Sequence, residues 1–136
     1  MNQQLFVNLA VKNLDQSVTF FKAFGFDFNP QFTDENATCM VIAENIQVML
    51  LTETYFQTFT PKKLCDAKST TEVLTALNRE SRGKVDELVA KAVAAGGRTY
   101  AEPKDYGFMY QHGFEDLDGH LWEIFWMDPA GLPKDA

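Results

Sequence analysis

The fold is decided by the opening of the chain, residues 6–26, which read FVNLAVKNLDQSVTFFKAFGF. The stretch is apolar and strand-like as far as Val11, and Lys12-Asn13 then supply polar side chains that start a turn or cap a helix. Gly25 stands where the end of a helix favours a left-handed residue. Between these two signals, apolar residues recur near helical spacing, namely Leu14, Val18, Phe21 and Phe24. The opening therefore predicts a strand followed by a helix.

The remainder of the chain extends this pattern and then repeats it. Residues 26–32, 38–43 and 46–52 read as strands, which makes the first half βαβββ. Residues 53–69 resemble an ordered connection with a short helical turn. A strand over 71–77, a helix ending at Gly96-Gly97, and strands over 98–101, about 107–115 and 121–127 then repeat the unit.

Composition narrows the class of protein. A chain of 136 residues is long enough for one buried core, and it has no apolar run near the ~20 residues that a membrane-spanning helix needs. Its net charge of −7 disfavours nucleic acid and anionic membranes as partners. The two cysteines, Cys39 and Cys65, form no CxxC motif, and we expect reduced thiols. The start of the chain has no signal-peptide pattern, so we expect a cytoplasmic protein.

Two segments carry a resemblance to a known family. Residues 6–26 are similar to the opening of many vicinal oxygen chelate proteins, a family that includes glyoxalases, bleomycin resistance proteins and extradiol dioxygenases. Residues 114–124, FEDLDGHLWEI, are similar to the family's terminal hairpin, where an aspartate-glycine turn leads into a strand with an acidic metal ligand. The two segments bracket nearly the whole chain.

The resemblance implies an α+β fold in which two βαβββ modules form an open curled sheet around a cavity. We therefore expect one glyoxalase-like domain over residues 1–136, with module one at about 4–53, a linker at about 54–70 and module two at about 71–128. In metal-using members of the family, the first and fourth strands of each module carry four His or Glu ligands.

Few of these ligand positions hold a suitable side chain here. Strand alternation puts Asn8 on the face away from the helix, at the first position, but an amide is a weak metal ligand. Aligning the hairpin turns puts Met49 opposite Glu123 in the repeat, and a thioether suits only soft metals. The third position falls near Leu74 or Thr75. Glu123 alone remains, so we predict no cofactor, with weak divalent metal binding through Glu123 as the alternative.

Glu123 is the candidate catalytic residue, with two interpretations. It could act as a general base, or it could anchor a polar group of a ligand within an aromatic cavity. We favour binding over catalysis, because an acidic residue in a cavity suggests catalysis without deciding it. His120, beside the hairpin glycine, is expected to be structural.

Aromatic residues complete the expected pocket. Tyr110 and His112 share one face of a strand, and we expect that face to line the cavity, although a lone strand histidine is usually non-catalytic. The connection after the fourth strand offers a lid, or equally a hydrophobic plug or dimer contact; its aromatic residues are Tyr55, Phe56 and Phe59. The last strand is expected to pack in the core through Trp122, Ile124 and Trp126.

These observations favour a glyoxalase or bleomycin resistance-like protein that binds a small, partly aromatic molecule without a complete metal site, as a homodimer. The alternative is a metal-assisted lyase, isomerase or dioxygenase that uses Glu123. A regulatory or partner-binding module has no specific support in the sequence. The sequence leaves open whether the protein is an enzyme, which ligand it takes, and whether the modules pair within one chain or between two.

Overall fold

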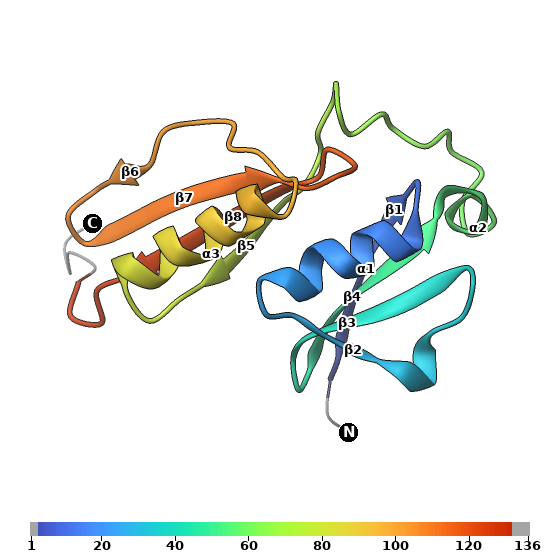
Figure 1. Cartoon of the computed structure of the whole chain (residues 1–136), viewed down its shortest axis with the longest axis horizontal. Helices are drawn as coiled ribbons and strands as arrows, with labels where there is room; N and C mark the ends of the chain where they lie inside the picture. Colours follow the sequence, from blue (N-terminus) through green and yellow to red (C-terminus); the bar gives the residue numbers. More distant parts are fainter. Residues whose placement is uncertain (1–2, 132–136) are drawn as a thin grey trace. The chain divides into compact units, whose positions relative to one another are not determined.

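The structure, a computed structural model, describes residues 3–131 of the chain. It divides into two compact units, Met1–Cys65 (unit 1) and Asp66–Ala136 (unit 2). Each unit contains a four-stranded sheet and a helix of ten or more residues (Figure 1). The predicted fold class, α+β with two βαβββ modules, is confirmed. That the two units act as one domain stays a prediction.

Unit 1 follows the predicted order of elements. These are β1 (Leu5–Val11), α1 (Leu14–Ala23), β2 (Asp27–Asn29), a 3₁₀ turn η1 (Pro30–Phe32), β3 (Ala37–Ala43), β4 (Ile46–Thr52) and the short α2 (Glu53–Gln57). The sheet order is β1-β4-β3-β2, with β1 parallel to β4 and the other pairs antiparallel. The strand predicted over 26–32 ends at Asn29, because Pro30 begins the 3₁₀ turn and the Asn29 side chain accepts a hydrogen bond from the Gln31 N–H.

The opening stretch builds the core of unit 1. The Asn13 side chain accepts a hydrogen bond from the Gln16 N–H at 3.0 Å and so caps α1, while Gly25 has the left-handed φ of 107° just after the helix. Phe20 and Phe21 are almost fully buried, and their rings meet edge to face at 5.0 Å. The helix contacts β3 and β4, where Val48 and Leu50 are also buried.

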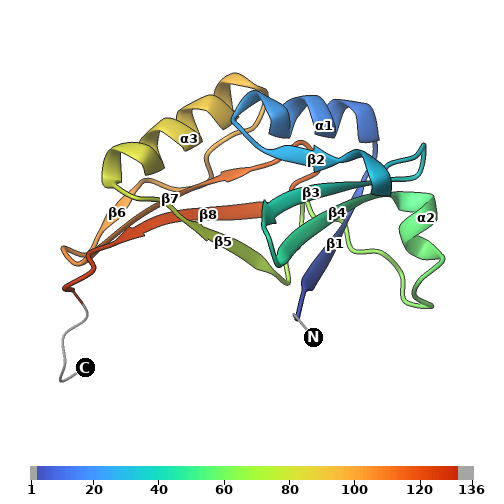
Figure 2. The same ribbon diagram turned by 90° about the horizontal axis from the view of Figure 1, so that it is seen from below.

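Unit 2 repeats the arrangement. Its elements are β5 (Leu74–Asn78), α3 (Arg82–Ala94), β6 (Lys104–Asp105), β7 (Met109–Glu115) and β8 (Leu121–Met127), and the sheet order is β5-β8-β7-β6. Helix α3 covers one face of β7 and β8 (Figure 2). Among the residues described, no helix is long and apolar enough to cross a membrane.

The prediction of a strand over residues 98–101 is wrong. Arg98 makes a single bridge with Glu115, through backbone hydrogen bonds of 2.7 and 3.2 Å, and the ladder resumes only at Lys104. Pro103 lies immediately before Lys104 and has no N–H to donate, which limits pairing there. The segment between Arg98 and Lys104 therefore runs beside β7 without forming a regular strand.

The core of unit 2 lies between α3 and the sheet. Trp122, Ile124 and Phe114 are fully buried, and the Trp122 and Phe114 rings stack at 6.1 Å, so the predicted core positions of Trp122 and Ile124 are confirmed. Trp126 is only half-buried, and the Arg82 guanidinium lies 4.9 Å from its ring centroid. Buried residues of α3 complete this core, namely Val85, Leu88, Val89 and Ala92.

The turn before β8 is fixed by Asp116. This buried carboxylate accepts hydrogen bonds from the N–H groups of Asp118 and His120 at 2.9 and 3.0 Å, and from the Trp122 indole N–H at 3.0 Å. Gly119 adopts a φ of 94° in the same turn. Burial raises the pKa of Asp116, while the neighbouring His120 and the donated hydrogen bonds act in the opposite direction.

Candidate functional site

Glu123 lies in the middle of a row of three residues across the sheet of unit 2. The parallel pairing of β5 with β8 sets Ala76 beside Glu123, and the antiparallel pairing of β7 with β8 sets Gly113 on its other side. Trp122 and Ile124 are buried in the core with α3, so alternation puts Glu123 on the opposite face. We call Ala76, Glu123 and Gly113 the Glu123 row. The third family position thus falls at Ala76, one residue beyond Thr75.

Tyr100 lies over the glycine of this row. Its hydroxyl oxygen and its ring carbon Cζ are 2.5 and 2.9 Å from the position that a Cβ atom would take at Gly113. The phenol therefore occupies the space that any other side chain at residue 113 would need. Because Gly113 is paired with Glu123, the phenol is placed beside the Glu123 carboxylate. Tyr100 was not predicted as a site residue from the sequence, although a glycine within a strand such as β7 is a known sign of close approach by another group.

The two carboxylates near this row, Glu115 and Glu123, differ in whether a basic side chain pairs with them. The Arg98 guanidinium Nε lies 2.6 Å from the buried Glu115 carboxylate, whose charge is thereby balanced. Within residues 3–131, no lysine or arginine forms an ion pair with Glu123, which is half-buried. Burial, and secondarily the negative charge of Glu123, raise the pKa of the Tyr100 phenol. The row consequently offers a carboxylate acceptor beside a phenol that keeps its proton.

The corresponding row of unit 1 carries different chemistry. Asn8 is paired with Met49, and Met49 with Cys39, so an amide, a thioether and a thiol stand side by side. Asn8 is exposed, Met49 is half-buried and Cys39 is buried. Burial raises the pKa of the Cys39 thiol, which favours its neutral form.

These side chains do not fit the metal site of the family. The positions in the first and fourth strands hold Asn8 and Met49 in unit 1, and Ala76 and Glu123 in unit 2. Glu123 is the one hard anionic donor among these four, whereas divalent cations require several oxygen or imidazole ligands. The part of the chain that the structure describes contains no group of three or more His, Cys, Asp or Glu residues able to hold a metal ion.

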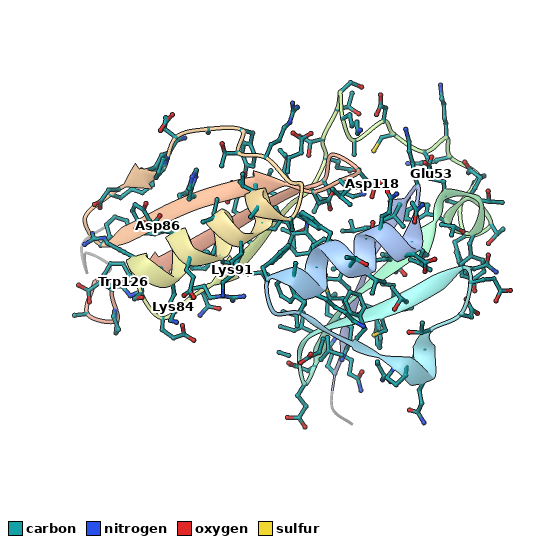
Figure 3. The ribbon with its side chains drawn as sticks, in the orientation of Figure 1. Glu53, Lys84, Asp86, Lys91, Asp118 and Trp126 are labelled. Atoms are coloured by element: carbon teal, nitrogen blue, oxygen red, sulfur yellow. The ribbon has the colours of Figure 1, made fainter. Side chains whose placement is uncertain are left out.

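Tyr110 and His112 lie on the other face of β7. The Tyr110 hydroxyl donates a hydrogen bond of 2.6 Å to Asp86 on α3, which raises the pKa of Tyr110 to about 12. His112 is paired with the buried Ile124. Figure 3 shows Asp86 and Trp126 near the start of α3, on the side of the sheet that this helix covers. The register therefore places Tyr110 and His112 together but separates them from Glu123.

The expected lid residues form a small cluster in unit 1. The rings of Tyr55 and Phe59 meet edge to face at 5.1 Å, and Phe59 is 67% exposed, whereas Tyr55 and Phe56 are half-buried. The Gln57 amide donates hydrogen bonds to the carbonyl oxygens of Thr60 and Lys62, which hold the connection in place. A lid function for this cluster stays a prediction.

Comparison with known proteins places the chain in a family. The model described as "Bleomycin resistance protein-like N-terminal" matches residues 3–43, and no curated protein matches the chain. A solved structure of a hypothetical protein from S. aureus is 33% identical, with a TM-score of 0.79, over 93% of this chain and 95% of that one.

Two further structures are similar in fold. A glyoxalase-related enzyme from Fulvimarina pelagi is 20% identical, with a TM-score of 0.78, over 100% of this chain and 96% of that one. A glyoxalase/bleomycin resistance protein/dioxygenase family enzyme from Burkholderia phytofirmans is 16% identical, with a TM-score of 0.76, over 93% and 99%. With these comparisons, the two βαβββ modules and the hairpin before Glu123 show that the chain belongs to the vicinal oxygen chelate superfamily.

Proposed function

We propose that the protein binds a small, partly aromatic molecule at the Glu123 row, without a complete metal site. The observation that carries this proposal is the Glu123 carboxylate beside the Tyr100 phenol, with only the Ala76 methyl group and Gly113 as its partners across the sheet. A carboxylate without an internal cation can accept hydrogen bonds from a ligand at little competing cost.

The neighbouring side chains suit a ligand with an apolar body. On β8, Leu121 and Phe125 flank Glu123 on the same face, because they are two residues away on either side. Leu74, paired with Leu121, is 52% exposed. Small-molecule sites typically combine such apolar surroundings with a few polar groups that fix orientation.

A thermal-shift screen of the full chain against aromatic metabolites and antibiotics tests the proposal. A true ligand raises the unfolding temperature, and its affinity falls about tenfold or more in Glu123→Gln, because a hydrogen bond to a charged group is lost. The matched control is Glu102→Gln, at an exposed residue of the same unit, which leaves the affinity unchanged. No shift across a broad panel would count against ligand binding.

A second candidate function is favoured by the same pair of residues. In a proton-transferring isomerase or lyase, the Glu123 carboxylate would take a proton from a carbon next to a carbonyl group. The Tyr100 hydroxyl would donate a hydrogen bond to the carbonyl oxygen as it gains negative charge. Exchange of that carbon-bound proton with deuterated solvent, followed by NMR and lost in Glu123→Gln, identifies this activity. Binding without exchange leaves ligand binding as the function.

The proposal includes a homodimer in the cytoplasm. In its own sheet, β1 is an outer strand, and it exposes Leu5 (57%), as expected of a surface that a partner covers. Cys39 and Cys65 are both free thiols, which suits a reducing compartment.

A further inference from the structure

We propose that the Glu123 and Tyr100 side chains recognise an amide edge of the ligand, in which an N–H donor and a carbonyl acceptor belong to the same group, as in a primary carboxamide or a lactam. This inference rests on the proposed binding function and names the chemical group that the Glu123 row selects.

The two side chains offer complementary hydrogen-bonding groups. An ionised carboxylate only accepts hydrogen bonds, whereas a phenol can donate its O–H. The Tyr100 phenol lies over Gly113, whose strand partner is Glu123, so both groups are on one face of β7 and β8. A ligand there meets an acceptor and a donor side by side.

Contacts outside the pair support the position of the phenol, whose residue is 41% exposed. Two residues before Tyr100, the backbone of Arg98 is hydrogen bonded to Glu115 in both directions, and its guanidinium is paired with the Glu115 side chain. At the other end, the phenol fits into the space left by Gly113. Such support restricts the positions open to the hydroxyl before a ligand arrives, which lowers the entropic cost of binding.

The hydrogen-bonding groups of the two side chains favour an amide over two related groups. An ordinary phenol has a pKa of about 10, so the Tyr100 hydroxyl carries a proton to donate at neutral pH, and burial and the charge of Glu123 raise this pKa further. A ligand carboxylate would meet the negative charge of Glu123 and be repelled. An amidinium would satisfy Glu123 but would provide no acceptor for the Tyr100 O–H. An amide uses both side chains, with its N–H donating to Glu123 and its carbonyl accepting from Tyr100.

Three probes of nearly equal shape test this inference: benzamide, benzoate and benzamidine. Each is titrated into the isotopically labelled full chain and followed by NMR, which also reports whether a variant is folded. We expect benzamide to bind most tightly and benzoate at least tenfold more weakly. In Tyr100→Phe, benzamide affinity falls about fivefold, the effect of one neutral hydrogen bond, while benzamidine affinity is unchanged.

The matched control is Tyr106→Phe, at a tyrosine that is 49% exposed in the same unit, and it leaves all three affinities unaltered. Tighter binding of benzamidine, or benzamide binding that is insensitive to Tyr100→Phe, overturns the amide preference. If none of the three probes binds while other aromatic compounds stabilise the protein, the amide preference is wrong and the proposed binding function stands. If no aromatic compound binds at all, both fail.

Discussion

The hydroxyl oxygen of Tyr100 lies 2.5 Å from the position that a Cβ atom would take at Gly113. The backbone oxygen of Trp122 is 2.7 Å from the same position. One contact is with a side chain that can move, and the other is with the backbone of the neighbouring strand. The absence of a side chain at residue 113 therefore serves both the packing of the sheet and the placement of the phenol beside Glu123.

Replacing Gly113 with alanine should destabilise the protein by about 1–3 kcal/mol, because the added methyl group overpacks the strand and displaces the phenol. Urea unfolding measures the loss. The matched control is Gly83→Ala in α3, where the nearest atom to the added Cβ is the Ser81 Oγ at 3.8 Å. That variant should gain about 0.5–1 kcal/mol from helix propensity. Equal effects in the two variants would show that crowding at Gly113 is not the cause.

The hydrogen bond from Tyr110 to Asp86 should be visible in a spectrophotometric pH titration. Tyr110 is expected to ionise at about 12, and in Asp86→Asn its pKa should return towards 10.0, because the charged acceptor is gone. Subtracting the titration of Tyr110→Phe isolates this residue from the other tyrosines. A curve that Asp86→Asn leaves unchanged would contradict the assignment.

The raised pKa of Tyr110 also predicts how the stability of the protein changes at alkaline pH. The folded pKa of Tyr110 lies above the unfolded one, so the folded state binds this proton more tightly. The stabilisation of the folded state by Tyr110 is therefore fully present below about pH 10. It is lost as the pH rises through about 12. Urea unfolding across this range should show a smaller loss in Tyr110→Phe than in the unaltered protein.

Asp116→Ala should reduce the free energy of unfolding by at least about 2 kcal/mol, because the buried Trp122 indole N–H and two backbone N–H groups lose their acceptor. The exposed Asp27→Ala is the control and should change it by less than about 0.5 kcal/mol. Burial raises the pKa of Asp116, so its contribution to stability decreases as the pH rises from 3.8 through the folded value. Asp116→Ala should flatten that part of the measured stability profile.

Divalent cations should leave thermal unfolding unchanged. Addition of Zn²⁺, Mn²⁺, Ni²⁺ or Fe²⁺ is expected to change the unfolding temperature of the unaltered protein no more than that of Glu123→Gln. The reason is that one carboxylate cannot preorganise a coordination sphere. Metal analysis of protein purified without chelators is the complementary measurement. One metal ion per chain would overturn the interpretation of Asn8 and Met49 as unsuitable ligands.

Light scattering after size exclusion should give twice the mass of one chain. Leu5→Lys, which puts a charge on the outer strand β1, should shift the population towards monomer. Val93→Lys, at a residue of α3 that is 42% exposed, is the control and should leave the dimer intact. A monomeric mass for the unaltered protein would show that the exposed apolar residues serve another purpose.

Much of the fold could be predicted from the sequence because its signals are local. The Asn13 cap, the helical spacing of the phenylalanines and the left-handed Gly25 act within a few residues of one another, and they correctly bounded α1. The strand before Pro30 was predicted too long, since periodicity does not show where a 3₁₀ turn takes over. Alternation along β8 likewise separated the buried Trp122 and Ile124 from Glu123.

The candidate site was only partly accessible in this way. Glu123 could be predicted from its strand and turn, but its neighbours depend on pairing between segments far apart in the chain. A shift of one residue in β7 exchanges Gly113 for His112 as the partner of Glu123, and the sequence does not specify that register. The sequence by itself determined the two βαβββ modules and the lack of suitable ligands at Asn8 and Met49. Only the tertiary structure decided that Tyr100 lies beside Glu123, because that placement depends on the Arg98 bridge and on the space at Gly113.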